Sequence, residues 1–435
     1  MASKADSIKL FSFHGAPMRA FHLTWVAFFI CFFAWFACAP LMPVIKGEFG
    51  LSMEQIANIN IAAVAITIFV RLLVGPLCDR YGPRKTYTGL LLLGSIPVLG
   101  VALAQSYEAF LLARLGIGAV GASFVITQYH TSVMFGPKVV GTANAAAAGW
   151  GNAGGGAAQA LMPLLLTAIV MLGVSQSLSW RLALVVPGVM MIVMAFFYWR
   201  YTQDCPAGNY DDLRKLGQMP EGGGKGGWAS FVEGCRNHRA WLLFVTYGAC
   251  FGIEIFIHNI AAVYYVEHFE LGLAQAGMAA ASFGLLALFA RALGGWLSDR
   301  AARGGNLNRR VTTLFVLMIG EGLGLLWFAQ ADGLVFAVLA MLVFGLFTHM
   351  ACGATYALVP FVAPKALGGV AGIVGAGGNV GAVAAGFLMK GTGDVRQTLT
   401  ILGALVLVAS LCAIAARFTA PAIAAAPAPA PAAAA

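Results

Sequence analysis

The sequence predicts an all-α polytopic membrane protein with twelve transmembrane helices in two pseudo-symmetric six-helix bundles. Hydrophobic residues make up 60% of the 435 residues and charged residues only 10%, with a mean hydropathy of +0.84, a composition that excludes a soluble domain of this length. The apolar residues form continuous runs of about 20 residues, long enough to cross a hydrocarbon core. In addition, the residues around Arg71 recur around Arg291, which indicates an internal repeat.

Twelve apolar runs can be placed along the chain. Because they are continuous and do not alternate at every second residue, they predict helices and not the strands of a barrel. The predicted spans are residues 21–45, 55–78, 84–104, 107–132, 139–172, 179–200, 240–266, 272–298, 311–330, 333–359, 366–391 and 395–418.

A polar segment divides the chain between the sixth and seventh spans. Residues 201–238 are rich in Gly, Pro and mixed charges, so we expect a linker there. It would join an N-terminal six-helix bundle (1–200) to a C-terminal one (239–419). Residues 420–435 contain almost only Ala and Pro, which cannot form a core, and we expect a disordered tail.

The net charge of +9 reflects membrane topology and not nucleic-acid binding. If both termini are cytoplasmic, most of the 26 Lys and Arg residues lie in cytoplasmic loops, and only Lys46, Arg181, Lys390 and Arg396 lie in outside loops. This asymmetry follows the positive-inside rule. We therefore predict a multi-pass protein of the inner or plasma membrane with both termini in the cytoplasm. No segment resembles a cleaved signal peptide.

The sequence contains no catalytic triad, nucleotide-binding loop or metal-like cluster, so it does not predict an enzyme. The eight cysteines are scattered without metal-ligand spacing, and we interpret them as small apolar fillers. We expect no cofactor, no metal and no nucleic acid as a partner.

Three arginines, Arg71, Arg114 and Arg291, lie deep within predicted spans, and two of them stand in equivalent surroundings. Arg71 and Arg291 each stand eight residues before an Asp-Arg pair, about 12 Å deep at 1.5 Å per residue, too deep to reach the interface easily. An arginine at a helix centre costs about 2.5 to 3.5 kcal/mol on insertion scales and usually marks function. Their equivalent placement suggests that one anion is held between the two repeats. The equivalent positions of the repeat, each pair 220 residues apart, are Arg71 and Arg291, Gly75 and Gly295, Asp79 and Asp299, and Arg80 and Arg300.

A second repeated element is rich in glycine. It reads GWGNAGGG from Gly149 in span five and GAGGNVGA from Gly375 in span eleven. Glycine weakens a helix by about 1 kcal/mol relative to Ala, and the usual compensation is close approach to a neighbouring backbone or a ligand. The element includes Asn152 and Asn379 as hydrogen-bonding groups and Gly151, Gly154, Gly378 and Gly381 as packing positions.

The loop after span two and its counterpart after span eight resemble the loop signature of the major facilitator superfamily. The first reads from Gly75 through Asp79 and Arg80 to Arg84, and the second from Gly295 through Asp299 to Arg300. Arg114, in LLARLGIGAVG, resembles the superfamily's fourth-helix motif. The resemblance implies a midplane site that opens alternately to either side, with these charges and Arg114 serving gating and structure.

The glycine-rich segments and the paired arginines resemble the nitrate/nitrite porter family of that superfamily. The motif from Tyr247 through Phe251 to Glu254, with the segment from Tyr356 to Val362, resembles its proton-coupled high-affinity branch. The resemblance implies that Arg71 and Arg291 clamp a nitrate or nitrite anion. It also implies that Asn152 and Tyr247 hydrogen-bond the anion, that Phe251 walls the pocket and that Asn379 is the counterpart of Asn152.

The chemistry of the residues agrees with such an anion. Nitrate is a small planar monoanion with several acceptor oxygens, which a planar guanidinium matches better than an ammonium does. Charge-assisted hydrogen bonds from two arginines would replace its hydration. Aromatic residues such as Phe33, Phe124 or Phe251 would then exclude larger or more strongly hydrated anions.

Glu254 is the candidate for proton coupling. A buried carboxylate away from cations can carry a proton at neutral pH, whereas one beside Arg291 would stay charged. We expect Glu254 to take up a proton with nitrate, against the alternative of a structural ion pair. Glu321, His258 and His349 also lie in spans. For Glu321 we expect a structural contact between helices, and for the two histidines hydrogen-bonded packing, against the alternative of a proton relay.

The sequence predicts a monomeric secondary active transporter of nitrate, with nitrite as a possible second substrate, in symport with protons. Nitrate/nitrite exchange is the alternative, because the same arginines could perform it without a titratable partner. Proton-coupled transport of formate or oxalate explains the Asn residues less well. A sensor that signals through its tail has the least support.

Overall fold

The computed structural model describes residues 4–9, 11–136, 139–218, 227–302, 306–363 and 367–418. Within these residues, twelve helical segments are long and apolar enough to cross a membrane. The predicted all-helical fold with twelve spans is therefore confirmed, and most spans begin and end within a few residues of the predicted bounds. The predicted tail at 420–435 lies outside the described residues.

The first six spans contain eight helices. Span one continues from its first helix through a 3-10 turn at Ala39–Leu41, and span four has a similar turn at Ala119–Ala122. The helices are α1 (Ala16–Phe36), α2 (Met42–Phe49), α3 (Met53–Tyr81), α4 (Pro83–Gly100), α5 (Tyr107–Gly118), α6 (Ser123–Met134), α7 (Val140–Met171) and α8 (Gln176–Tyr201).

The second six spans contain seven helices, and two further helices precede them. Span eight is divided at Leu286 into two helices. The helices are α9 (Tyr210–Lys215), α10 (Gly227–Arg236), α11 (His238–Phe269), α12 (Leu273–Leu285), α13 (Ala287–Ala301), α14 (Asn308–Gln330), α15 (Leu334–Val362), α16 (Leu367–Thr392) and α17 (Val395–Ala415).

Local sequence sets several helix ends. Ser52 and Gln55 form a capping box at the start of α3, which satisfies backbone N–H groups that have no partner within the helix. Asp394 caps α17 by accepting from the Gln397 amide at 2.6 Å. Gly50 ends α2 in the left-handed conformation, with φ of 63°, which glycine adopts without steric cost.

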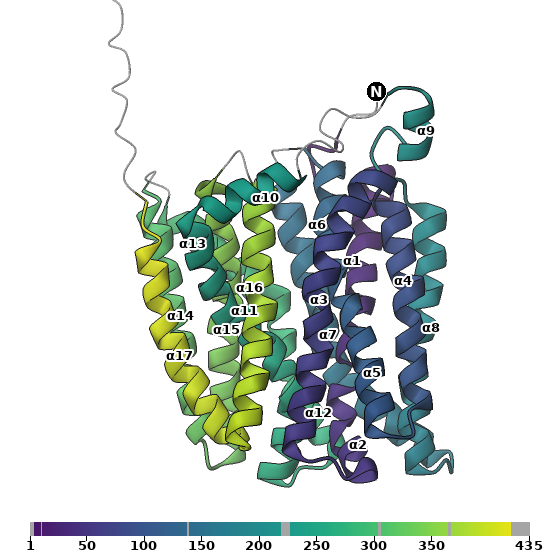
Figure 1. The fold of residues 1–435 in the computed structure, drawn as a ribbon, viewed down its shortest axis with the longest axis vertical. Helices are drawn as coiled ribbons and strands as arrows, with labels where there is room; N and C mark the ends of the chain where they lie inside the picture. Colours follow the sequence, from purple (N-terminus) through teal and green to yellow (C-terminus); the bar gives the residue numbers. More distant parts are fainter. Residues whose placement is uncertain are drawn as a thin grey trace, which may run out of the picture.

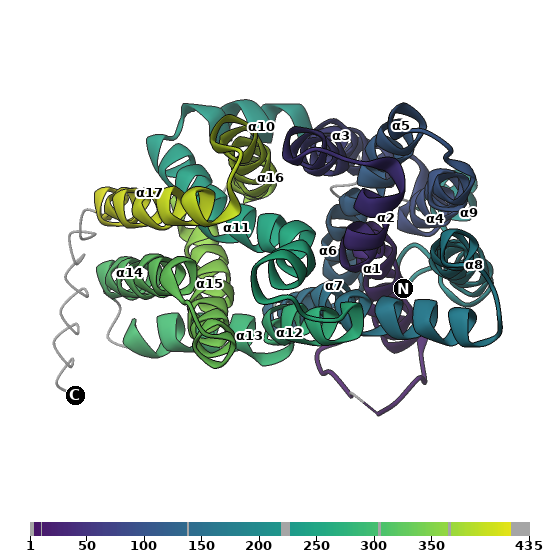
Figure 2. The same ribbon diagram turned by 90° about the horizontal axis from the view of Figure 1, so that it is seen from below.

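The helices form two groups side by side, α1–α8 and α10–α17 (Figures 1 and 2). Both ends of the described chain, together with α9 and α10, lie at the top of Figure 1, and we call this end the terminal face. The opposite face carries α2. The two groups meet where α3 packs against α16 and where α7 packs against α12 and α13.

Glycines allow the closest helix contacts. A Cβ at Gly154 in α7 would lie 2.1 Å from the Phe29 carbonyl oxygen of α1. A Cβ at Gly381 in α16 would lie 2.2 Å from the Gly248 carbonyl oxygen of α11. Since such contacts are far below van der Waals distance, any larger residue would force these helix pairs apart.

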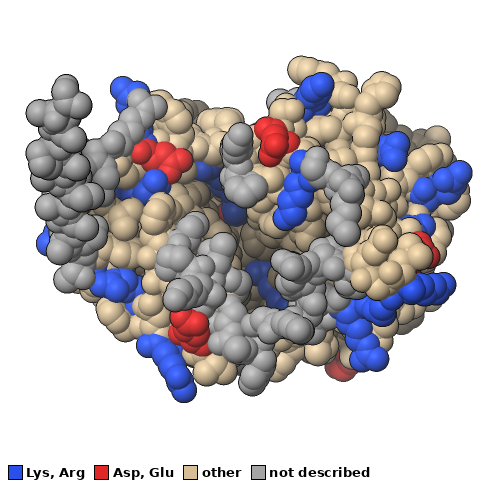
Figure 3. All heavy atoms as spheres, turned by 90° about the horizontal axis from the view of Figure 1, so that it is seen from above, with Lys and Arg blue, Asp and Glu red and all other residues tan. Residues whose placement is uncertain are grey.

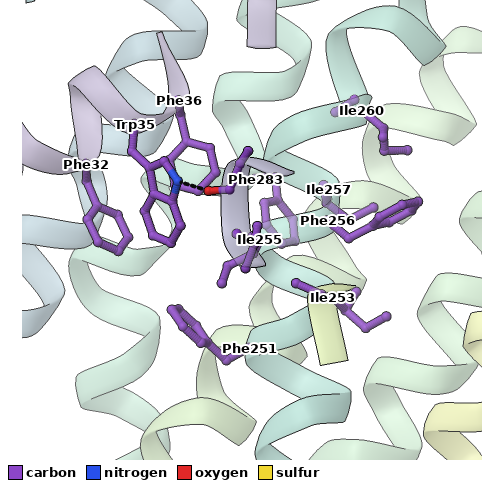
Figure 4. Close-up of a cluster of buried hydrophobic side chains, with 14 of the residues drawn as sticks. Phe32, Trp35, Phe36, Phe251, Ile253, Ile255, Phe256, Ile257, Ile260 and Phe283 are labelled. Carbon is purple, nitrogen blue, oxygen red and sulfur yellow. Dashed lines mark hydrogen bonds between the residues drawn. The ribbon is translucent and has the colours of Figure 1, made fainter. Parts of the chain in front are cut away.

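Aromatic side chains fill the interface between the two groups. Phe36 of α1 lies beside Phe283 of the second group, with Trp35 and then Phe32 on its other side (Figure 4). Trp35 donates its indole N–H to the Ala63 carbonyl oxygen at 2.6 Å, drawn as a dashed line. The Phe36 ring lies 4.7 Å from the His258 ring. This cluster gives the two halves a shared buried core.

Candidate anion-binding site

The first of the two repeated arginines crosses from one half of the molecule to the other. Arg71 lies on α3 and its Nη2 donates to the Gly121 carbonyl oxygen at 3.1 Å. Its Nη1 donates to the Gly375 carbonyl oxygen of α16 at 3.3 Å. The side chain is only partly buried, and both partners are neutral carbonyls. Its positive charge is thus hydrogen-bonded but not neutralised by these contacts.

The second arginine is paired with an acid. Arg291 on α13 donates from Nη2 to Glu254 Oε2 on α11 at 2.5 Å. Arg291 is 9% exposed and Glu254 is 1% exposed, so this ion pair is nearly removed from solvent. Arg291 Nε is buried without a hydrogen-bond partner in the described part of the chain, which leaves it one free donor.

The Phe251 ring brings the two arginines to one place. It lies 6.0 Å from the Arg71 guanidinium carbon and 5.2 Å from that of Arg291, within the range of cation–π attraction. The predicted members Arg71, Arg291 and Phe251, which are far apart in sequence, therefore lie together. Both halves of the molecule contribute a cation to this one location.

An aromatic wall surrounds these cations. We define it as Phe124, Tyr247, Phe251 and Tyr356. Tyr247 stacks on Phe251 with centroids 5.1 Å apart, and Tyr356 meets the edges of Tyr247 at 5.0 Å and Phe124 at 6.2 Å. Phe124 also lies 5.6 Å from the Arg71 guanidinium. Two hydroxyls and four apolar rings thus border the arginines.

Glycine at position 378 makes room for the wall. A Cβ there would lie 2.3 Å from Phe251 Cδ1. In the other glycine-rich helix, a Cβ at Gly151 would lie 1.8 Å from Phe28 Cδ1. All four predicted glycines, Gly151, Gly154, Gly378 and Gly381, stand at close contacts between helices.

The two asparagines are buried with unused hydrogen-bonding capacity. Asn152 is 1% exposed, and neither its amide nitrogen nor its oxygen has a partner among the described residues. Gly149 and Gly156, one turn away on either side, face α13 and α12, so Asn152 lies on the α7 surface that meets the second half. Asn379 donates to the Gly375 carbonyl oxygen at 3.4 Å, and its own oxygen is unpartnered within the described chain. Buried amides usually have partners, so these two can accept a polar ligand.

The charges of the loop signature lie away from this site, at the terminal face. Arg84 donates from Nε to the Trp199 carbonyl oxygen at 2.8 Å and covers the Trp199 ring at 4.2 Å. Arg80 lies over Tyr81 at 5.2 Å. The side chain of Asp79 lies outside the described residues.

The matching positions of the second repeat are also at helix ends. Asp299 forms an ion pair with Arg310, and Arg300 lies over the Trp296 ring at 5.4 Å. Arg80 and Arg300 therefore lie over different aromatic rings, Tyr81 and Trp296, although they occupy matching positions of the repeat.

Sequence analysis missed the residue that organises the first of these loops. Asp204, just after α8, accepts from the backbone N–H groups of Arg84 and Tyr210, both at 2.9 Å. Its carboxylate leaves no room for a Cβ at Gly82, which has φ of 86°. Burial raises the pKa of Asp204. A single acid within a segment interpreted as linker gave no signal, because its partners are backbone groups.

Arg114 links the halves beyond the anion site, closer to the opposite face. It is fully buried and donates to the Trp35 carbonyl oxygen at 2.9 Å and to Asn259 Oδ1 of α11 at 3.0 Å. Asn259 was not singled out by sequence analysis. One guanidinium thus holds α5, α1 and α11 together.

Further polar contacts join the halves at the opposite face. Lys46 forms an ion pair with Glu267, and Lys390 lies 3.1 Å from Glu54. The terminal face is instead hollowed between the halves, with Lys or Arg atoms visible in the hollow (Figure 3). The structure is therefore closed at the opposite face and more open at the terminal face.

Comparison with known proteins assigns the fold and the family. The family model "Major Facilitator Superfamily" matches residues 24–385. The chain superposes on a bacterial homolog of the human lysosomal transporter Spinster, in an inward-facing and unoccupied conformation, with a TM-score of 0.71 at 16% identity. That match covers 94% of this chain and all of the other. Similarity at this level concerns the fold.

Similarity in sequence is much higher to a set of plant, algal and cyanobacterial transporters. The "High affinity nitrate transporter 2.5" of Arabidopsis thaliana is 39% identical over 412 residues, covering 94% of this chain and 81% of the relative. The "Nitrate transporter 2.1" of Chlamydomonas reinhardtii is 37% identical, covering 91% and 73%. The "Nitrate/nitrite transporter NrtP" of Nostoc punctiforme is 30% identical, covering 86% and 87%. The chain therefore belongs to the major facilitator superfamily and, within it, to the nitrate/nitrite porter family.

Proposed function

We propose that this protein transports nitrate, and also nitrite, across the inner or plasma membrane by alternating access and in symport with protons. The observation that carries the proposal is the pair of guanidinium groups, one from each half, that share the Phe251 ring. The names of the relatives support the substrate, since all three compared above are nitrate or nitrate/nitrite transporters.

The chemistry of the site suits a small, weakly hydrated planar anion. Guanidinium donors match flat oxygen-rich anions, and the uncompensated charge of Arg71 supplies attraction. The unpartnered amide nitrogen of Asn152 would donate to an anion oxygen, and so would the second N–H of Asn379, whose amide nitrogen already donates to Gly375. The aromatic wall would penalise sulfate or phosphate, because these anions lose more hydration on entering an apolar pocket.

The location of the site fits alternating access. With the termini in the cytoplasm, as the positive-inside rule favours, the hollowed terminal face is the cytoplasmic one (Figure 3). The described conformation is then open inward. Opening outward would require the contacts of Lys46 and Lys390 with the other half to break.

Counterflow in proteoliposomes tests the substrate. Nitrate and nitrite are expected to exchange, whereas chloride and formate are not. Arg71→Ala and Arg291→Ala should each abolish nitrate counterflow, whereas Arg200→Ala, at an exposed arginine over Tyr201, should retain it. Nitrate binding that survives both site substitutions would refute the assignment.

Proton coupling is tested by the driving force. Uptake into liposomes that contain no nitrite should be accelerated by an inward proton gradient, which separates symport from nitrate/nitrite exchange. The ion pair between Glu254 and Arg291 supports a part for Glu254 in coupling, because a charged carboxylate beside an anion-binding arginine would be affected by both the anion and a nearby proton. If Glu254→Gln keeps the full acceleration, Glu254 is not required for coupling.

A further inference from the structure

His349 is a buried imidazole whose two nitrogens both face oxygen atoms. It lies on α15 and is fully buried. Its Nε2 lies 3.0 Å from the Phe283 carbonyl oxygen of α12. Its Nδ1 lies 3.3 Å from Glu254 Oε2 but has no hydrogen-bond partner among the described residues. Sequence analysis favoured a packing role for this histidine over a proton relay.

These two contacts determine where hydrogens must sit. A carbonyl oxygen only accepts, so Nε2 must carry its hydrogen and donate to Phe283. In a neutral imidazole, Nδ1 would then carry a lone pair 3.3 Å from the Glu254 carboxylate. A lone pair so close to a buried carboxylate is unfavourable, so the pair would stabilise one additional proton on His349 or Glu254.

The position of Arg291 indicates which of the two holds it. Glu254 Oε2 already accepts from Arg291 Nη2 at 2.5 Å, and an arginine at this distance favours the charged carboxylate. The additional proton then belongs on His349 Nδ1, 3.3 Å from Glu254 Oε2. The carboxylate is placed between two cations, one of which is titratable.

Other titratable groups lie near this pair. His258 lies one turn from Glu254 on α11, and neither of its ring nitrogens has a hydrogen-bond partner in the described chain. The Cys352 thiol faces Glu254 Oε2 at 3.7 Å. The groups that face the pair are His258 and Cys250 of α11, Arg291 of α13, Glu321 of α14, which contacts Thr348, and Cys352 of α15.

We propose that His349 carries the coupled proton, in a two-residue site with Glu254, and that Arg291 links this site to the anion. The inference rests on the proposed proton symport and adds the residue that holds the proton. The Arg291 guanidinium is shared, because it pairs with Glu254 while lying over Phe251 beside Arg71. When an anion binds Arg291, the positive charge of Arg291 neutralises Glu254 less completely. The proton on His349 then supplies positive charge beside Glu254.

Electrostatic attraction then couples the two substrates. With both bound, the cations Arg71, Arg291 and His349 surround the anions Glu254 and nitrate. The negative charge of nitrate favours the protonated form of His349, and the protonated His349 in turn favours nitrate. Nitrate binding should therefore take up a proton, and a lower pH should strengthen nitrate binding.

The test compares two buried histidines in the purified full-length protein. His349→Gln keeps an amide that can donate to a carbonyl but cannot hold the proton. His258→Gln is the matched control, since His258 is equally buried and close to Glu254. The nitrate dissociation constant is measured between about pH 5 and 9, and proton uptake on nitrate addition is followed with a pH dye in weak buffer.

Wild-type protein and His258→Gln should bind nitrate up to about tenfold more weakly per pH unit as His349 deprotonates, with proton uptake on binding. His349→Gln should bind nitrate with a flat pH profile and without proton uptake. If the pH dependence of nitrate binding in His349→Gln matches that of the wild type, the inference is overturned, whereas proton symport is not. Absence of proton uptake and of gradient-driven transport in the wild type would refute the proposed symport itself. His349→Asn replaces His349→Gln if the latter is not monodisperse.

Discussion

Replacing Glu254 by Gln tests how much the ion pair between Glu254 and Arg291 contributes to the free energy of unfolding. The substitution keeps the shape of the side chain but removes its charge from a pair that is 1% and 9% exposed, with 2.5 Å between the charged atoms. Removing one partner of a buried ion pair costs about 3 to 5 kcal/mol, because the remaining charge is left uncompensated. We expect Glu254→Gln to lower the unfolding free energy of the anion-free protein by about this amount.

A second buried glutamate provides the matched control. Glu321 on α14 is fully buried, but its contact is the Thr348 hydroxyl at 3.1 Å, and no Lys or Arg pairs with it among the described residues. Glu321→Gln therefore replaces one hydrogen-bonding group by another, with an expected change of about 1 kcal/mol or less.

The assay is unfolding in detergent with and without nitrate. Since Glu254→Gln leaves Arg291 without its carboxylate partner, nitrate should stabilise this variant more than the wild type. The increase in unfolding free energy should grow with nitrate concentration. Equal losses of unfolding free energy in Glu254→Gln and Glu321→Gln would refute the reasoning. So would a Glu254→Gln protein that is as stable as the wild type.

Three further predictions concern packing, protonation and gating. Gly154→Ala should lower stability by about 2 kcal/mol or more in thermal unfolding, because its Cβ would lie 2.1 Å from a backbone oxygen, whereas Gly372→Ala, with open space around it, should be neutral or stabilising. Burial raises the pKa of Asp204, so the folded state binds its proton more tightly than the unfolded state. The stability of the wild type relative to Asp204→Asn should thus increase as the pH falls towards about 4; a pH-independent difference would contradict this. Removing Lys46 and Lys390 together should favour the outward-open state by about two- to thirtyfold, since exposed pairs contribute about 0.2 to 1 kcal/mol each, as measured by labelling cysteines introduced at the opposite face.

Local properties of the chain were sufficient to predict the fold class, the number of membrane spans and the paired arginines. Hydropathy over about 20 residues depends only on neighbouring residues, so the twelve spans could be placed before any contact was known. Arg71 and Arg291 were evident because charge is rare in such segments. The repeat could be seen because its residues recur at a fixed offset.

The partners of those residues depended on the tertiary structure. The sequence left open whether Glu254 stands alone or beside Arg291, and the packing of helices within the second half placed it at 2.5 Å from that arginine. It also brought His349 of α15 to the same carboxylate, although sequence analysis had considered each residue separately. Asp204 was missed for a similar reason, since it binds backbone groups that carry no sequence signal.

The sequence by itself thus determined a twelve-helix membrane protein with two arginines at equivalent depths, because these features follow from local hydropathy and charge. Only the tertiary structure decided that the arginines share the Phe251 ring, and that one is paired with an acid while the other is not. The physical reason is that a helix fixes which residues share its faces but not which neighbour each face will meet. That choice is made by packing between helices far apart in the chain.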